Sequence, residues 1–158
     1  MNTEAQLIVD GQVRQTLQLN LANLRQLPLA EQIDDVRHLG AKREGQAVRL
    51  EAVLRQAQVS PDATHLGLHG VRDDFHASIP LEPVLHRGLI IYAVAGQPLA
   101  VEHGGPFRFF IPDHSACHLD EIDECANVKY LDRIELTVGK GFDNRPQDDE
   151  EHARLHEQ

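Results

Sequence analysis

The residues best suited to metal chemistry gather in one short segment, 113–125. It contains both cysteines of the chain, Cys117 and Cys125, together with His114, His118 and several acidic residues. His114 and Cys117 are three positions apart and could chelate one ion from a single helical turn. A structural zinc site, however, usually combines two closely spaced ligand pairs, and the interval from Cys117 to Cys125 is too long for one pair. We therefore favour a solvated acidic loop with one buried cysteine, and keep Cys125, Cys117 and His114 as the weaker alternative of a metal site.

Outside this segment, the sequence carries none of the short motifs of common catalytic or nucleotide-binding sites. The nucleophile elbow GxSxG, the zinc motif HExxH, the phosphate-binding P-loop and the dinucleotide motif GxGxxG are all absent from it. The motifs therefore identify no catalytic residue.

Length and charge limit the class of protein to which the chain can belong. The chain has 158 residues and 41% of them are apolar, which suffices for one domain with a conventional core. No apolar run approaches the roughly 18 residues of a membrane span. The first residues, MNTEAQLIVDG, lack the regions of a signal peptide, so we expect a cytoplasmic protein with free thiols. The net charge of −10 argues against nucleic acids and anionic membranes as partners.

Hydrophobic periodicity predicts a mixture of short strands and helices. Alternating apolar residues indicate paired strands over 6–13 and 16–19, and Asn20 stands where the N-cap of a short leucine-rich helix belongs. A strand is expected over 33–39 and a helix over 48–59, whose buried face contains Leu50, Val53, Leu54 and Ala57. The remaining strands and one helical turn are expected at 65–69, 75–81, 82–86, 89–94, 107–111 and 129–138.

These elements predict a single α+β domain over residues 1–138. Residues 139–158 differ in composition, being acidic and poor in apolar groups, and we expect them to form a solvated, flexible tail. The predicted core is made of apolar residues from the helix and the strands: Leu50, Val53, Leu54, Leu89, Ile91, Phe109, Ile111, Ile134 and Leu136.

The order of motifs along the chain is similar to that of one family. An Asp-Gly strand and a leucine helix ending in Leu-Pro come first, followed by VRLxxVL, DATH and ASIPL. The most specific pieces are EHGGPFRFFIP at 102–112 and NVKYLDRIEL at 127–136. Together they resemble the molybdopterin-binding domain of the sulfite-oxidase family. The resemblance implies a sulfite-oxidase-type fold with a mixed sheet or partly rolled barrel and a few flanking helices.

The resemblance also implies where a cofactor binds. The pterin of these enzymes carries a phosphate and a dithiolene that holds molybdenum. Its binding residues correspond here to His103 and Arg108 in the first motif, and to Asn127, Val128 and Lys129 in the second. A bidentate guanidinium and an ammonium are suited to a phosphate. We expect His103, Arg108 and Lys129 to converge on one cleft.

A simpler interpretation of the first motif is available. Gly104 and Gly105 would let backbone N–H groups approach an anion, because neither has a Cβ in the way. The same two glycines followed by proline also suit a tight turn into a strand, with Arg108 on the solvent face of that strand. His103 is then held by a hydrogen bond within the turn.

The sequence departs from the family at the metal. The active enzymes also bind molybdenum through a cysteine that lies between the leucine helix and the VRL helix. The corresponding interval here, 29–48, contains no cysteine, and neither His38 nor Lys42 replaces a thiolate for a soft metal. We therefore expect molybdopterin or another small anion as the ligand, without molybdenum.

Three functions remain open from the sequence. The first is a molybdenum oxidoreductase of the sulfite-oxidase type with a relocated ligand, for which Cys125, two residues before Asn127, is the better candidate. The second is a member of the fold that binds a pterin or another anion and whose catalysis is lost. The third is a structural or protein-interaction module with an unknown protein partner. The missing thiolate argues against the first, and the presence of His103, Arg108 and Lys129 favours the second over the third.

We predict that the protein is not itself a working sulfite oxidase. Loading with molybdenum cofactor should produce neither a thiolate-to-molybdenum absorption band nor sulfite-driven reduction of an artificial acceptor, because residues 29–48 offer no sulfur ligand. Activity that appears on loading and is lost in Cys125→Ser would contradict this prediction and make Cys125 the ligand.

Overall fold

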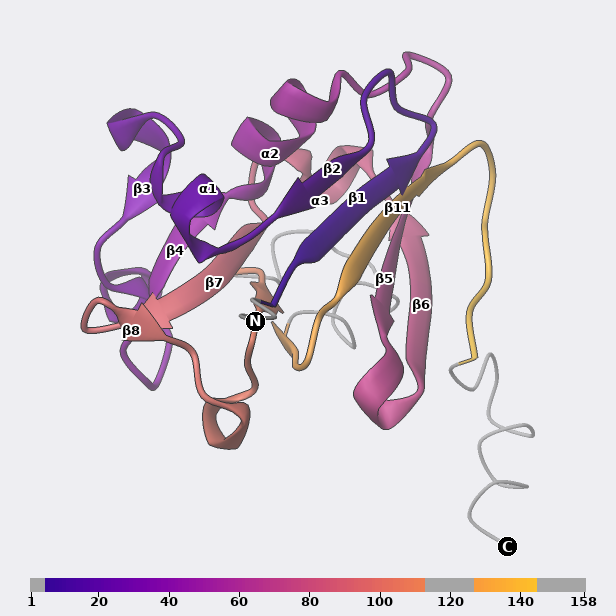
Figure 1. Ribbon diagram of the computed structural model, residues 1–158. Coiled ribbons are helices and arrows are strands. Elements are labelled where there is room, and N and C mark those ends of the chain that lie inside the picture. The colour runs from indigo at the N-terminus through magenta and orange to yellow at the C-terminus, as the bar shows by residue number, and fades with distance from the viewer. Residues whose placement is uncertain (1–4, 113–126, 145–158) are drawn as a thin grey trace, which may run out of the picture.

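The computed structural model describes residues 5–112 and 127–144, and their strands form two sheets (Figure 1). The first sheet has the order β2 (Leu17–Leu19), β1 (Leu7–Gly11), β11 (Arg133–Thr137), β5 (His65–Gly70) and β6 (Phe75–Pro80). The second has the order β10 (Asn127–Val128), β9 (Arg108–Phe110), β7 (Leu89–Val94), β4 (Gln46–Arg49) and β3 (Gln32–Ile33), and β8 (Gln97–Pro98) also pairs with β7.

Short helices connect the strands in the described part of the chain. Three are α-helices: α1 (Leu21–Arg25), α2 (Leu50–Ala57) and α3 (Glu82–Leu85). Four are single 3₁₀ turns: η1 (Leu29–Glu31), η2 (Val36–Leu39), η3 (Val71–Asp73) and η4 (Val101–His103). The predicted α+β class is confirmed, with two sheets that do not close into a barrel in the described residues. In the same part of the chain, no helix has the length and apolar character needed to cross a membrane.

The first sheet is mixed because the two ends of the domain meet in it. β1 pairs with β2 as an antiparallel hairpin and with β11 in parallel, with Ile8 opposite Arg133. The hairpin was predicted from the alternation of apolar residues. The Asn20 side chain caps α1 by accepting a hydrogen bond from the Asn23 N–H at 2.8 Å, as its position before the leucines predicted.

The structure corrects three predicted elements, of which one is the strand expected over 129–138, since β11 begins only at Arg133. Residues 33–39 are not one strand, because only Gln32–Ile33 pair with β4, and Val36–Leu39 form a 3₁₀ turn whose N-terminus Asp35 caps. The predicted helix over 48–59 begins at Leu50, since residues 46–49 pair with β7 as strand β4. The helical spacing of the leucines was correct, but it did not reveal that the preceding residues form a strand.

The larger core cluster lies between the sheets and α2. It unites β1, β5 and β11 of the first sheet with the buried face of α2 and with Ile90 and Phe109 of the second sheet. All nine predicted core residues are at most 7% exposed, so that prediction is confirmed. The domain therefore closes around one principal core.

A smaller cluster covers the other face of the second sheet. It contains Leu89 and Ile91 of β7 with Val36, Ala47 and Leu99, and Phe110 packs against it. Because side chains alternate along a strand, Ile90 points into the principal core while its neighbours point to the opposite face. β7 is thus buried on both faces, as its unbroken apolar run predicted. This second face bears the candidate site.

Residues 139–144 follow the edge of β6. The Ser78 N–H donates to Oδ2 of Asp143 at 2.9 Å, and the Asn144 N–H donates to the His76 carbonyl at 2.9 Å. These bonds use backbone groups that the edge strand would otherwise expose. The rest of the predicted tail, 145–158, lies outside the described residues.

Phe109 and Phe110 are neighbours on β9 that point to opposite faces, and they offer a matched test of this packing. Phe109 is fully buried in the principal core, whereas Phe110 is half-buried. Phe109→Ala should lower the free energy of unfolding by about 3–5 kcal/mol, because it leaves a cavity between the sheets. Phe110→Ala should cost clearly less. Urea denaturation measures both losses, and equal losses would contradict the orientation of β9.

Candidate functional site

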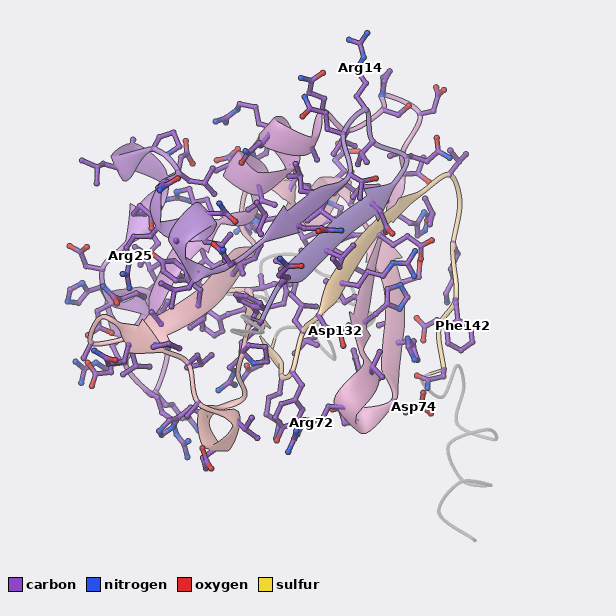
Figure 2. All side chains as sticks on the ribbon, viewed as in Figure 1. Arg14, Arg25, Arg72, Asp74, Asp132 and Phe142 are labelled. Atoms are coloured by element: carbon purple, nitrogen blue, oxygen red, sulfur yellow. The ribbon has the colours of Figure 1, made fainter. Side chains whose placement is uncertain are left out.

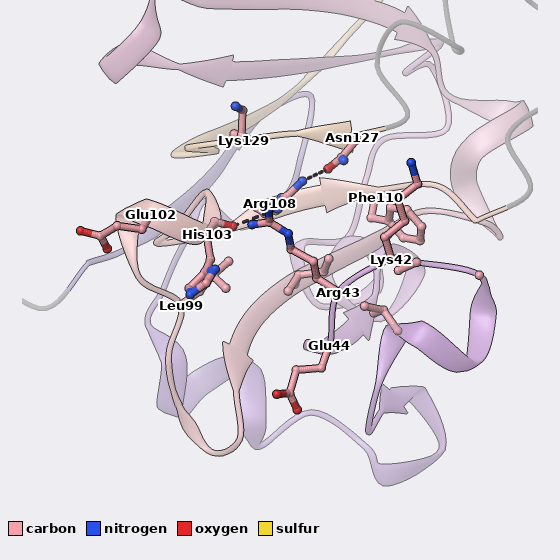
Figure 3. Close-up of a pocket in the computed structure, with 14 residues that line it drawn as sticks. Lys42, Arg43, Glu44, Leu99, Glu102, His103, Arg108, Phe110, Asn127 and Lys129 are labelled. Atoms are coloured by element: carbon pink, nitrogen blue, oxygen red, sulfur yellow. Dashed lines mark hydrogen bonds between the residues drawn. The ribbon is translucent and has the colours of Figure 1, made fainter.

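A cavity of about 640 Å³ opens on the second face of the second sheet (Figure 3). Its floor is apolar and belongs to the smaller core cluster. Its rim carries charged side chains from two separate parts of the chain, the loop 40–45 and the segments around β9 and β10. The lining residues are Val36, Gly40, Ala41, Lys42, Arg43, Glu44, Ile91, Leu99, Glu102, His103, Arg108, Phe110, Asn127 and Lys129. A volume of this size suits a small organic ligand.

The Arg108 guanidinium is held in a fixed position at this cavity. Its Nη1 donates a hydrogen bond to the His103 carbonyl at 2.9 Å, and its Nη2 donates to Oδ1 of Asn127. Its Nε is buried and has no hydrogen-bond partner in the described residues. Both acceptors are neutral, so the charge of Arg108 is oriented without being neutralised.

Gly104 provides the space in which the Arg108 side chain lies. It has a φ of +90°, and a Cβ at this position would meet Cδ of Arg108 at 2.7 Å. The N–H groups of Gly104 and Gly105 donate hydrogen bonds within the turn, to the carbonyls of Val101 and Ala100 respectively. The expectation that these N–H groups face an anion is therefore wrong. The glycines serve the packing of the turn and of Arg108.

Backbone bonds bring the second motif against the first. Asn127 pairs with Phe110 across β10 and β9, and the Tyr130 N–H donates to the Gly104 carbonyl at 2.8 Å. This pairing places the exposed side chains of Asn127 and Lys129 on the cavity. Val128, between them, points into the principal core and does not line the cavity. Because side chains alternate along the strand, Val128 points to the face opposite that of Asn127 and Lys129.

His103, Arg108, Asn127 and Lys129 therefore line one cavity, as expected from the sequence. His103 is held by its backbone, since its N–H donates to the Ala100 carbonyl at 2.9 Å and its own carbonyl accepts from Arg108. Its exposed side chain lines the cavity.

The cavity is rich in positive charge. Lys42, Arg43, Arg108 and Lys129 line it, with Glu44 and Glu102 as the only carboxylates among its described lining residues. The pKa of Arg108 is lowered, first by burial and then by the nearby charge of Arg43. A concentration of cations is notable in a chain whose net charge is −10.

Lys42 and Arg43 were not predicted as site residues. They lie in the interval 29–48, which sequence reasoning considered only for a missing cysteine. The adjacent Lys-Arg pair between Gly40 and Gly45 was the available signal, because glycines commonly bound a loop. Only the fold shows that this loop faces Arg108.

The described part of the chain offers no soft metal ligand. Residues 5–112 and 127–144 contain no cysteine or methionine, and they form no group of three or more His, Cys, Asp and Glu side chains that could hold a metal ion. The sequence candidates His114, Cys117 and Cys125 lie outside the described residues.

The chain belongs to the family described as the oxidoreductase molybdopterin binding domain, whose model matches residues 2–142. It is thus a molybdopterin-binding domain related to oxidoreductases of the sulfite-oxidase type. Its fold is similar to that of the sulfane dehydrogenase SoxCD from Paracoccus pantotrophus, with a TM-score of 0.60 and 18% sequence identity. The match covers 86% of this chain and 39% of the dehydrogenase chain. No curated protein matches the chain. The family and fold inferred from the motifs are confirmed.

Gly104→Ala tests whether this glycine positions Arg108. The new Cβ should displace the Arg108 side chain, which can move more easily than backbone, and so break its bonds to His103 and Asn127. Hydrogen exchange of the Arg108 Nε–H, followed by NMR, should then become faster.

Gly96→Ala is the matched control. Gly96 also has a positive φ, +81°, but nothing lies within 4 Å of a Cβ placed there. Both variants should lose about 1 kcal/mol of stability from backbone strain. Equal Nε–H exchange in the two variants would refute the role of Gly104.

Proposed function

We propose that this domain binds a molybdopterin-type pterin through the phosphate of the ligand. The observation that carries the proposal is the cation-lined cavity on a domain of the molybdopterin-binding family. Anion binding also agrees with the charge distribution, because the cavity concentrates cations on a chain of opposite net charge.

Arg108 and Lys129 would hold the phosphate. Two of the five guanidinium N–H groups of Arg108 are used by His103 and Asn127, and its Nε–H is buried, so two Nη hydrogens remain for an anion. The Nζ of Lys129 lies 5.8 Å from the centre of the Tyr130 ring and adds a mobile charge. His103 and Asn127 complete this part of the rim.

The apolar floor would support the ring of the ligand. Ile91 and Leu99 are at most 7% exposed, and the half-buried Phe110 lines the same cavity. A planar heterocycle gains contact with such side chains, while its acidic group stays at the rim. The chain's own residues would thus bind and orient the pterin.

The described residues do not fit the metal of the cofactor. The polar side chains that line the cavity are ammonium, guanidinium, imidazole, amide and carboxylate groups, and none supplies the thiolate that the active family members use. We therefore derive no redox step for this domain. The likeness to the sulfane dehydrogenase is one of fold, and we propose no sulfur substrate from it. Cytoplasmic location and the exclusion of nucleic acids and membranes stay predictions from composition.

Direct binding tests the proposal. A pterin phosphate should bind the wild-type protein, and Arg108→Gln should weaken binding by about 1.5–3 kcal/mol, the loss of a charge-assisted hydrogen bond. Lys129→Gln should cost less, because an exposed ammonium is screened by solvent. Titration of the pterin fluorescence measures each affinity.

Arg14→Gln is the control, because Arg14 lies on the β1–β2 connection, at the top of the view in Figure 2, and does not line the cavity. It should bind like the wild type. Equal affinity for the phosphate-free pterin, or equal losses in Arg14→Gln and Arg108→Gln, would contradict the proposed phosphate site.

A further inference from the structure

The loop 40–45 forms the wall of the cavity that faces Arg108, and its two ends are fixed. The Val36 N–H donates to the Gly45 carbonyl at 2.8 Å, and the Ala41 N–H donates to the Val36 carbonyl at 3.2 Å. A Cβ on Gly45 would meet Cγ2 of Ile91 at 3.0 Å, so the loop is pressed against β7. The backbone between these ends is therefore held at the rim of the cavity.

Asp35, which precedes this loop, and Glu44, which belongs to it, both pair with an arginine that does not line the cavity. Arg37 forms ion pairs with Asp35 at 2.6 Å and with Glu44 at 3.9 Å. The hydrogen bonds from Arg37 lower the pKa of Asp35 to about 2, so that carboxylate stays ionised and paired. Arg37 does not line the cavity. Arg37 thus neutralises Asp35 and pairs with Glu44, which lines the cavity beside Arg43.

Lys42 and Arg43 have no carboxylate partner within residues 5–112 and 127–144, where no ion pair includes either of them. Arg43 and Arg108 line the same cavity, and the pKa of Arg108 is lowered first by burial and then by the like charge of Arg43. Figure 3 shows the Arg43 side chain reaching toward Arg108, and Lys42 and Arg43 both line the cavity. Like charges gathered on opposite walls repel each other, and an anion between them would relieve that repulsion.

We propose that Lys42 and Arg43 form a second anion subsite, so that the ligand of this cavity carries two separated acidic groups. One group is held by Arg108 and Lys129, and the other by the loop 40–45. The proposal rests on the proposed function, since both concern the same cavity. It assigns positive charge to two parts of the rim, and so it predicts an organic dianion with a flat body over Ile91, Leu99 and Phe110.

Two matched series of simple ligands test the number of acidic groups. Linear alkane diphosphonates of increasing length carry an acid at both ends, and alkyl monophosphonates of the same lengths carry one. Isothermal titration calorimetry at low and high salt gives the affinities. In the wild type, the diphosphonate of best length should bind at least about 10-fold more tightly than its monophosphonate, because the second contact becomes intramolecular. High salt should reduce this advantage.

Variants then test whether the tighter binding of the diphosphonate comes from the loop 40–45. The double variant K42Q/R43Q should abolish the preference for the diphosphonate and leave monophosphonate affinity within about twofold of the wild type, as expected for screened, exposed charges. Both side chains are exposed, so the fold should be retained. Arg14→Gln removes one positive charge far from the cavity and should change neither series.

The outcomes separate the two proposals. Equal binding of both series, with Arg108→Gln still weakening both, would overturn the second subsite and leave the phosphate site intact. A diphosphonate preference that survives in K42Q/R43Q, or that falls equally in Arg14→Gln, would also overturn it. If neither series nor the pterin phosphate binds, the proposed function fails, and the second subsite fails with it.

Discussion

The candidate site depends on one interaction, the packing of the Arg108 side chain against the backbone of Gly104. The guanidinium reaches the His103 carbonyl on one side and the Asn127 side chain on the other, so it joins two motifs that are separate in sequence. Only a glycine leaves room for this side chain, because a Cβ would come within 2.7 Å of it. The β9–β10 pairing and the bond from the Tyr130 N–H to Gly104 hold the same junction from the backbone.

The second sheet explains why a cavity forms at this place. β7 is buried on both faces, yet the principal core fills only one of them. The opposite face is covered by loops and the turn η2, which leave an apolar floor with a charged rim. The charge of the cavity is opposite in sign to that of the whole chain. Acidic residues dominate the chain, whereas lysine and arginine side chains gather around this floor. An anionic ligand is favoured there and repelled elsewhere.

Family membership and the residues of the cavity agree on an anionic ligand and disagree on the metal. The chain belongs to a family of molybdopterin-binding domains, and its cavity has the cations that a phosphate requires. A soft metal requires a different kind of donor, and the described residues contain no sulfur. A fold can keep its ligand pocket while the chemistry of its walls changes, because packing and catalysis depend on different side chains.

The sequence by itself determined the α+β class, the hydrophobic core, the family and four of the residues that line the cavity. Hydrophobic periodicity and motif order are local properties, so they can be recognised in a single chain. Tertiary structure alone decided that Lys42 and Arg43 line the same cavity as Arg108, since this cavity joins a loop and a strand far apart in sequence. It also decided that Val128 is a core residue, because the register of β10 sets which neighbours point outward. The spacing of the glycines could not distinguish a turn that binds an anion from a turn that holds an arginine, because that depends on where the N–H groups of the folded turn point.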